Sequence, residues 1–580
     1  MRPADYARLL RRYLQPQWQR VTLLAALPLG GLAVQLINPQ IIRYFLDTVQ
    51  SGGSQELLAL AAVAFVGVAL SQQLISLGAL YAGEQVAWDA TNRLRHDLTL
   101  HLLRLDLPFH KVHTPGELIE RIDGDASAVA SFFSQFAVQA IGSSLLVVGI
   151  LAVLYATNWR VGLGLTAYVA VTILILARVQ DTAADRWRQV RQAEAELYGF
   201  IEERLSGADD LRALGAIPYQ IYRLLLIVRT VLGKYRSAAI MSGVIFNLTN
   251  LVGVVGFAVG LGLAVWLYTR GQASIGTAFL IVAYVGMLSL PLQRLREEAR
   301  NLQQASGALQ RINELFRLQP LVADPPAAAS LPCGAMSVEF RNVDFGYGDE
   351  AQVLKCVSFS LRPGKVLGVL GRTGSGKTTL TRLLFRLYDP AGGAILLGGV
   401  NLRDTALAQL RSRVGMVTQD VQLFQASLRD NLAFFDDSQS DSTLWSALDA
   451  ARLADWVRAL PGGLAAPLAS GGQGFSAGEA QLLAFSRVFL KDPGLVILDE
   501  ASSRLDPATE RRMEAAIDQL LAGRTAIIVA HRLQTVQRAD DILILENGRV
   551  LEYGPRISLA ADPHSRFYHL LQTGLVEALA

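Results

Sequence analysis

The chain has 580 residues, more than one compact hydrophobic core normally holds, so at least two domains are expected. Apolar residues make up 51% of the chain and charged residues 18%, and the mean hydropathy is +0.31, which is unusual for a soluble protein of this size. The formal net charge of +3 gives no global basic field of the kind that binds nucleic acid, so we expect no nucleic-acid partner.

The N-terminal segment, residues 1–20, is basic and precedes a long apolar run. Arg2, Arg8, Arg11 and Arg12 resemble the start of a secretion signal, but no small-residue cleavage site follows and further apolar runs do. We expect instead an amphipathic segment on the cytoplasmic membrane surface, with its arginines near anionic headgroups.

Six apolar stretches follow, each close to or above the ~20 residues that cross a bilayer as a helix. They lie near residues 21–48, 57–81, 135–157, 161–178, 243–268 and 275–293. The sequence therefore predicts an α-helical transmembrane domain of six spans over residues 21–294.

The connections between these stretches alternate between tight and long. The long ones, 82–134 and 179–242, carry most of the basic residues, while the short ones add little beyond Arg160 and Arg270. By the positive-inside rule, both termini and both long connections are cytoplasmic, as in a multi-pass protein of the plasma (inner) membrane.

The long connections are rich in helix-forming residues, so we expect the membrane helices to continue into the cytoplasm. Each connection turns near its middle, around Pro108–Gly116 (the first tip) and around Leu205–Gly215 (the second tip). Solvated connectors are one interpretation. We favour the other, in which the tips press on the second domain and carry its motion to the membrane.

Residues 295–335 form a linker that runs from a charged helical stretch into the Pro/Ala-rich segment Asp324-Pro325-Pro326-Ala327. From residue 336 to 580, short β-rich runs alternate with helical ones, as at Val338–Phe340, Val366–Leu370, Leu495–Leu498 and Ala526–Val529. This alternation predicts an α/β domain with a largely parallel sheet. The two cysteines of the chain, Cys333 and Cys356, lie in this C-terminal half; they have neither metal-ligand spacing nor a partner cluster and are interpreted as packing thiols.

The strongest motif is a glycine-rich turn that follows the strand Val366–Leu370 and opens a helix, the arrangement of a P-loop. Backbone N–H groups of such a loop converge on phosphates; Lys377 would reach the β- and γ-oxygens, and Thr378 could ligate Mg²⁺. The motif reads Gly371-Arg372-Thr373-Gly374-Ser375-Gly376-Lys377-Thr378-Thr379.

A second apolar strand, Leu495–Leu498, ends in the carboxylates Asp499 and Glu500. A buried strand needs the apolar run, but it does not need two acids at its end. Asp499 is suited to organise the Mg²⁺ shell, and Glu500 to act as general base for the attacking water.

Residues 337–570 resemble the nucleotide-binding domain of ABC transporters, and the whole chain resembles an exporter-type half-transporter of the multidrug and lipid-exporter type. The resemblance implies that Tyr347 stacks on adenine and that Gln419 senses Mg²⁺ and the attacking water. It also implies that Asp506 belongs to the D-loop and that His531 bonds the γ-phosphate. ATP and Mg²⁺ are thus the expected ligands.

The signature segment departs from the family pattern Leu-Ser-Gly-Gly-Gln, because here it reads Phe475-Ser476-Ala477-Gly478-Glu479. Ser476 and Gly478 keep a hydroxyl and a backbone N–H for the γ-phosphate of the partner's nucleotide. Ala477 adds a methyl group, and Glu479 places negative charge near a polyanion. We expect the site that this segment completes to bind ATP but to turn it over poorly, which favours a heterodimer over a homodimer.

The resemblance implies ATP-driven export, or flipping between leaflets, by a dimer of such subunits. No span carries a central charged pair, so an amphipathic or apolar small molecule, lipid or drug is the mild preference for the substrate. An ATP-gated channel or regulatory protein of the same architecture is the alternative. Polar residues in or near the spans could line a path or join helices: Gln35, Asn38, Gln135, Gln139, Asn247 and Asn250.

Overall fold

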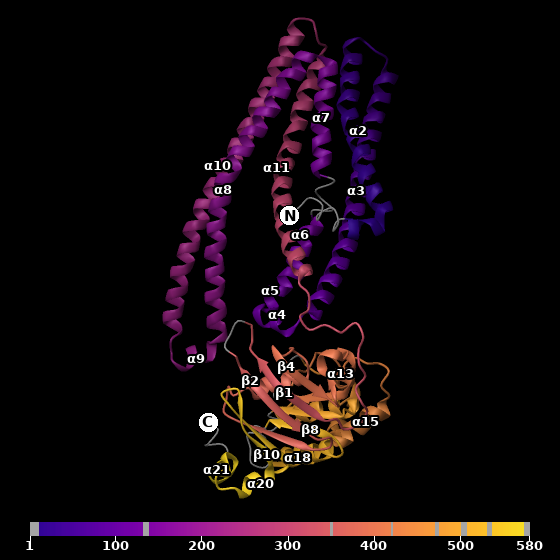
Figure 1. Ribbon diagram of the computed structural model, residues 1–580. Coiled ribbons are helices and arrows are strands. Elements are labelled where there is room, and N and C mark those ends of the chain that lie inside the picture. Colours follow the sequence, from indigo (N-terminus) through magenta and orange to yellow (C-terminus); the bar gives the residue numbers. More distant parts are fainter. Residues whose placement is uncertain are drawn as a thin grey trace. The chain divides into compact units, whose positions relative to one another are not determined.

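The computed structural model describes residues 11–131, 139–348, 352–418, 421–469, 475–499, 507–529 and 536–573 (Figure 1). The chain divides into two compact units. The helical unit comprises Met1–Leu103 and Pro115–Leu318, and the ATPase-like unit comprises Arg104–Thr114 and Gln319–Ala580. The chain therefore crosses between the units three times, after residues 103, 114 and 318.

Long helices dominate the helical unit. Among the described residues, four helices are long and apolar enough to span a membrane, at Arg11–Gln50, Gln55–Arg104, Ile217–Thr269 and Ile275–Leu295. Two shorter apolar helical stretches, Ile141–Thr157 and Trp159–Ile175, accompany them. The helices are α2 (Trp18–Gln50), α3 (Gln55–Arg104), α7 (Ile141–Thr157), α8 (Trp159–Ser206), α10 (Ile217–Thr269) and α11 (Ile275–Arg317).

The predicted helical extensions are confirmed. Helix α10 has 53 residues, about 80 Å at 1.5 Å per residue, whereas a bilayer core is about 30 Å thick. Helices α8 and α10 run side by side and are joined by the short helix α9 (Ala208–Ala213) at the second tip (Figure 1). The remaining short helices of this unit are α5 (Pro115–Glu120), the π-helix η2 (Arg121–Asp125) and α6 (Ala126–Ser131).

Helices α7, α8, α10 and α11 share a core of large aliphatic side chains that includes Ile150, Leu154, Leu165 and Leu280. Tyr284 ties α11 to α2, because its hydroxyl donates to the carbonyl of Leu36 at 2.8 Å. Many other apolar side chains on these helices are exposed, as expected for surfaces that meet lipid.

The N-terminal arginines make specific ion pairs. The helical stretch that the structure describes from Arg11 onward passes through the 3₁₀ turn η1 (Gln15–Gln17) directly into α2. Arg12 pairs with Asp97 at 2.7 Å and Arg20 with Asp89 at 2.5 Å, both on α3. The described part of segment 1–20 is therefore continuous with the first long helix, and these arginines bind carboxylates of the protein.

The ATPase-like unit contains two sheets. The six-stranded sheet has the order β10-β9-β3-β8-β7-β6 and is parallel except for β9–β10. Its strands are β3 (Val366–Leu370), β6 (Val414–Val417), β7 (Leu495–Asp499), β8 (Thr525–Val529), β9 (Asp541–Glu546) and β10 (Arg549–Pro555).

A separate four-stranded antiparallel sheet has the order β2-β1-β4-β5. The predicted parallel sheet is present, but Val338–Phe340 lies in this second sheet, which the sequence pattern did not separate from the first. Its strands are β1 (Val338–Phe345), β2 (Leu354–Leu361), β4 (Gly392–Leu397) and β5 (Val400–Asn401).

The parallel sheet is buried on both faces, because its strand residues alternate between two cores. Leu495 and Ile497 face the core shared with the antiparallel sheet. Val496 and Leu498 face the core under helices α14 (Leu428–Ala433), α15 (Asp441–Ala450) and α17 (Ala477–Lys491). The helices of this unit are α4 (Leu107–Val112), α12 (Lys377–Leu384), η4 (Leu402–Asp404), α13 (Leu407–Arg413), α14 (Leu428–Ala433), α15 (Asp441–Ala450), α16 (Ala454–Ala459), η5 (Gly463–Ala465), α17 (Ala477–Lys491), α18 (Pro507–Leu521), α20 (Arg556–Ala561) and α21 (Arg566–Thr573).

Candidate functional site

The glycine-rich loop lies between the fully buried strand β3 and the N-terminus of α12. Two of its glycines have positions that no other residue fits. Gly371 has φ +150°, and a Cβ there would meet the carbonyl oxygen of Leu545 at 2.3 Å. Gly376 has φ +106°, and its Cβ would meet Leu354 at 2.5 Å. The loop is therefore wrapped tightly against β9 and β2, with its backbone N–H groups next to the helix N-terminus.

Side chains of the loop fit a polyphosphate. The Ser375 hydroxyl oxygen is buried and has no hydrogen-bond partner among the described residues. Lys377 is 6% exposed, and its ammonium donates to the carbonyls of Gly371 at 2.6 Å and Arg372 at 3.0 Å. These two bonds hold the cation over the loop, where a polyphosphate would compete for it. The exposed residues Thr373 and Gly374 form the rim of the loop.

The residues predicted to hold Mg²⁺ lie at the same edge of the sheet. Asp499 ends β7, and Thr378 lies in the first turn of α12, just after the loop that follows β3. Because β3, β8 and β7 are parallel neighbours, their carboxyl ends meet at one edge. A buried carboxylate and an exposed hydroxyl suit Mg²⁺, which takes few protein ligands and completes its shell with phosphate and water.

Tyr347 lies in an aromatic cluster beside the loop helix. Its hydroxyl is 3.0 Å from the hydroxyl of Thr379, so this predicted nucleotide-binding threonine also positions the tyrosine. The Lys111 ammonium lies 4.4 Å from the centroid of the Tyr347 ring. Burial and the neighbouring Tyr347 raise the pKa of the Tyr388 phenol, which stays protonated at neutral pH.

Lys111 is a residue that the sequence reasoning did not single out. It belongs to the first tip, which was predicted to press on the second domain, and residues 104–114 do belong to the ATPase-like unit. Leu107 also packs against the core between the two sheets. The presence of a lysine within the tip was the only hint in the sequence of a contact with the site. The sequence could not show that this lysine faces Tyr347, which is more than 200 residues away in the chain.

The signature segment begins α17 with a reciprocal capping box. The Ser476 hydroxyl accepts from the backbone N–H of Glu479 at 3.2 Å, and the Glu479 carboxylate accepts from the N–H of Ser476 at 2.8 Å. Gly478 is buried in the first turn. Glu479 therefore has a structural role in addition to the charge that the sequence analysis considered.

Four predicted residues lie outside the described residues: Gln419, Glu500, Asp506 and His531. Their roles remain predictions. Glu500 directly follows Asp499 at the end of β7, and residue 531 comes two positions after β8, so both follow strands that end at the edge of the P-loop.

The helical unit contains a cavity of about 480 Å³ among α2, α3, α7 and α11. Gln35 and Gln139, two of the polar residues noted in the sequence, line it together with Gln72 and Arg294, which the sequence analysis did not name as lining residues. The predicted Gln135 lies outside the described residues.

The other polar residues noted in the spans do not line this cavity. Asn247 donates to the carbonyl of Gly243 on its own helix at 2.8 Å, which is a structural role. Asn250 is exposed on α10. The side-chain oxygen of Asn38 is buried without a partner among the described residues.

Two family models match the chain. The model described as ABC transporter transmembrane region matches residues 22–292, and the model described as ABC transporter matches residues 354–503. Together they cover most of both units.

Curated relatives and a solved structure match nearly the whole chain. The ATP-dependent lipid A-core flippase of Burkholderia orbicola (strain AU 1054) is 31% identical over 92% of this chain and 90% of its own length. An uncharacterized ABC transporter ATP-binding protein, YknV, of Bacillus subtilis (strain 168) is 28% identical over 97% and 93%. The structure of a bacterial Atm1-family ABC exporter with ATP bound has a TM-score of 0.84 at 24% identity and covers 96% of this chain and 99% of its own.

Proposed function

From the premise that this chain belongs to the ABC transporter family, as an exporter-type half-transporter that couples ATP hydrolysis to transport, we propose that it moves an amphipathic or apolar compound outward or between leaflets. The protein is a multi-pass membrane protein that acts as a dimer. The observation that carries the proposal is the P-loop itself, in which the buried residues Ser375 and Lys377 lie at the N-terminus of α12.

In this proposal, the residues of the loop would bind and orient the nucleotide. Backbone N–H groups and Lys377 would bind the β- and γ-phosphates, while Thr378 and Asp499, with Gln419, would hold Mg²⁺. Mg²⁺ would neutralise charge that develops on the phosphate oxygens. Glu500 takes a proton from the attacking water, and His531 donates to the γ-phosphate.

The cavity in the helical unit supports the choice of substrate class. It offers polar groups beside aliphatic walls: amides and a hydroxyl from Gln35, Gln72, Ser76 and Gln139, and the guanidinium of Arg294. An amphipathic molecule can place its polar part against the amides and its chain against the aliphatic residues. The name of the Burkholderia relative indicates a lipid for that protein, and we extend to this chain only the amphipathic character.

A groove of about 530 Å³ in the ATPase-like unit supports docking of the partner's second tip. Phe385, Phe424 and Phe434 line it, and the Arg487 guanidinium lies 4.5 Å from the Phe434 ring centroid. Burial lowers the pKa of Arg487 to about 10, so it stays a cation at neutral pH.

The second tip has complementary features. Helix α9 has no buried residue and starts with the acidic pair Asp209 and Asp210. Leu214 and Leu205, at its two ends, are 80% and 72% exposed. Acidic and apolar groups on the tip thus match the basic and aromatic groups of the groove. We place the ATPase units and both termini in the cytoplasm, with the spans in the plasma (inner) membrane.

The proposal is tested with the chain and its natural partner, purified together and placed in lipid vesicles. Lys377→Ala should abolish ATP binding and ATP-dependent uptake of the co-purified compound, because one ammonium no longer meets the phosphates. The matched control is Lys355→Ala, which removes an ammonium on β2, outside the glycine-rich loop. Unchanged ATP binding in the Lys377 variant would contradict the site assignment.

A further inference from the structure

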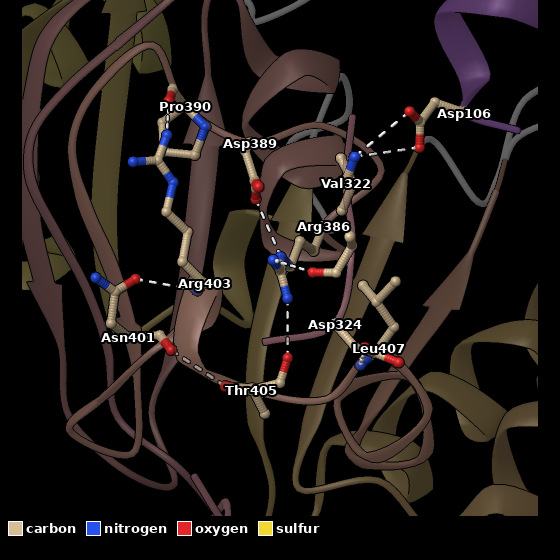
Figure 2. Close-up of polar contacts among 11 residues, drawn as sticks. Asp106, Val322, Asp324, Arg386, Asp389, Pro390, Asn401, Arg403, Thr405 and Leu407 are labelled. Carbon is tan, nitrogen blue, oxygen red and sulfur yellow. Dashed lines mark hydrogen bonds and ion pairs between the residues drawn. The ribbon is translucent and has the colours of Figure 1, made fainter. Parts of the chain in front are cut away.

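Residues 321–324, which we call the strap, are bound to three different elements of the ATPase-like unit within four consecutive positions (Figure 2). They lie just after the chain leaves the helical unit at residue 318. A connector that served only as a tether would need no such bonds. These hydrogen bonds therefore fix the position of the strap within the ATPase-like unit.

Asp106 binds the start of the strap. Its carboxylate accepts from the backbone N–H groups of Leu321 and Val322, with 3.4 Å to Val322. Asp106 occupies the N-cap position of α4, where an aspartate ordinarily accepts from its own helix, but its side chain makes no capping bond. This carboxylate therefore accepts hydrogen bonds from the strap and not from the first turn of its own helix.

Arg386 binds the middle of the strap from the end of the P-loop helix α12. Its guanidinium donates to the carbonyl of Ala323 at 3.0 Å, to the carbonyl of Thr405 at 2.8 Å and to the carboxylate of Asp389 at 3.0 Å. Arg386 is 3% exposed and has φ +49°, a left-handed conformation that glycine usually supplies at a helix end. This backbone conformation places the side chain in a buried position, where the planar guanidinium donates to three acceptors.

Asp324 binds the end of the strap to α13. Its carboxylate accepts from the N–H of Leu407 at 2.6 Å, and the chain continues to Ala329, whose N–H donates to the backbone carbonyl of Asp404 at 2.7 Å. The strap thus connects the P-loop helix, the helix α13 and the first tip by consecutive hydrogen bonds (Figure 2).

The bonds of the strap join two of the three places where the chain crosses between the units. Asp106 follows the end of α3, and Leu321 follows the end of α11. Within the helical unit the same two helices are also joined, because His101 Nε2 lies 2.9 Å from the carbonyl oxygen of Leu315. The chain segments at the ends of α3 and α11 are therefore hydrogen-bonded to each other twice, once within the helical unit and once within the ATPase-like unit.

We propose that Asp106 is a positioning residue for coupled transport: it fastens the strap to the first tip, so that the P-loop helix, through Arg386, moves the ends of α3 and α11 together. The inference rests on the proposed export cycle and deepens it. Without the Asp106 bond, the ATPase units would still bind nucleotide and close, but α3 and α11 would follow separately or not at all.

The experiment measures amide hydrogen exchange of the full chain with its natural partner in lipid nanodiscs, with and without ATP, in wild type, Asp106→Asn and Asp106→Ala. In Asp106→Ala, peptides that contain Leu321 and Val322 should exchange about tenfold faster, because both amides lose a charged acceptor. The ATP-dependent protection of the P-loop should persist, while the ATP-dependent change in α3 and α11 should fall at least threefold. Asp106→Asn keeps one acceptor oxygen and should lie between the two.

Asp437→Ala is the matched control, because it removes a carboxylate that is fully exposed in the same unit. Wild-type exchange at the strap, or a wild-type ATP response of α3 and α11 in both Asp106 variants, would overturn the inference. Loss of the ATP response throughout the wild-type protein would instead contradict the proposed function. A merely structural role for Asp106 would weaken both units alike and would not separate their ATP responses.

Discussion

Glu479 and Ser476 hold the first turn of α17 through two reciprocal hydrogen bonds. The family's usual glutamine could make the same bond through its amide oxygen, since a capping box accepts Glu or Gln at this position. The substitution in this chain therefore leaves the helix start intact and changes the charge that the partner's nucleotide meets. Fold and catalysis are affected separately at this residue.

Glu479→Gln should raise ATP turnover at the site that this signature completes, by several fold, because a negative charge no longer faces the polyanion. The melting temperature should stay close to that of the wild type. ATPase assays and thermal unfolding of the native dimer measure the two effects. Glu479→Ala is the control: it also removes the charge, but loss of the capping bond should lower stability by roughly 0.5–2 kcal/mol. Turnover that is unchanged in both variants would show that the charge does not limit hydrolysis.

Gly376→Ala should unfold the P-loop region or shift it away from the nucleotide. The new Cβ would lie 2.5 Å from Leu354 at φ +106°. Gly364 separates the two causes, because it has φ +73° but open space around its Cβ. Gly364→Ala should show only the left-handed strain, about 1–2 kcal/mol, in chemical unfolding. An equal loss in both variants would mean that Leu354 moves aside easily.

The P-loop and the strand that ends in Asp499 could be predicted from the sequence, because each motif consists of consecutive residues. The capping role of Glu479 could not be read before the helix start was known. The contact between Lys111 and Tyr347 could not be read at all, because it depends on how a distant tip packs beside the P-loop helix. Local motifs are therefore visible in the sequence, while long-range partners of the same site are not.

The two tips each contain a short helix, and the surroundings of these two helices differ. Helix α4 packs within the ATPase-like unit through Leu107, Asp106 and Lys111. Helix α9 has no buried residue. We expect α9 to find its partner surface on the second subunit.

Leu214→Asp should weaken docking of α9, because a carboxylate replaces an apolar side chain that is 80% exposed here and buried at the interface. Substrate-stimulated ATPase activity of the dimer should fall at least fivefold, with ATP binding retained. Thr230→Asp places the same carboxylate at an exposed position on α10, away from the tip, and should leave the activity near wild type. Equal activity of the two variants would remove α9 from the interface.

Prediction of the elements worked where periodicity or length was unambiguous. The buried strands β3, β7 and β8 and the long membrane helices followed from their apolar runs. The run Val338–Phe340 was assigned to the same alternating α/β pattern, but β1 pairs antiparallel with β2 and β4. Strand direction depends on the partner strand, and a short apolar run does not specify that partner.

For the whole molecule, the altered signature segment and the presence of Glu500 in the sequence predict two unequal ATP sites in a heterodimer. The chain purified alone should bind ATP yet hydrolyse it at a small fraction of the rate reached with its partner. Co-purification from the native host, followed by ATPase assays with and without the partner, measures the difference. A fully active dimer of this chain alone, stimulated by substrate, would exclude the heterodimer.

The ATPase-like unit is discontinuous in the chain, since it includes Arg104–Thr114 as well as Gln319–Ala580. This has a practical consequence for chimeric transporters. A graft that exchanges this unit at a single junction near residue 319 would transfer only the C-terminal segment. The recipient would keep its own sequence at the positions of Arg104–Thr114, the eleven-residue piece of the same unit. Two segments would have to be transplanted together for the exchanged module to arrive whole.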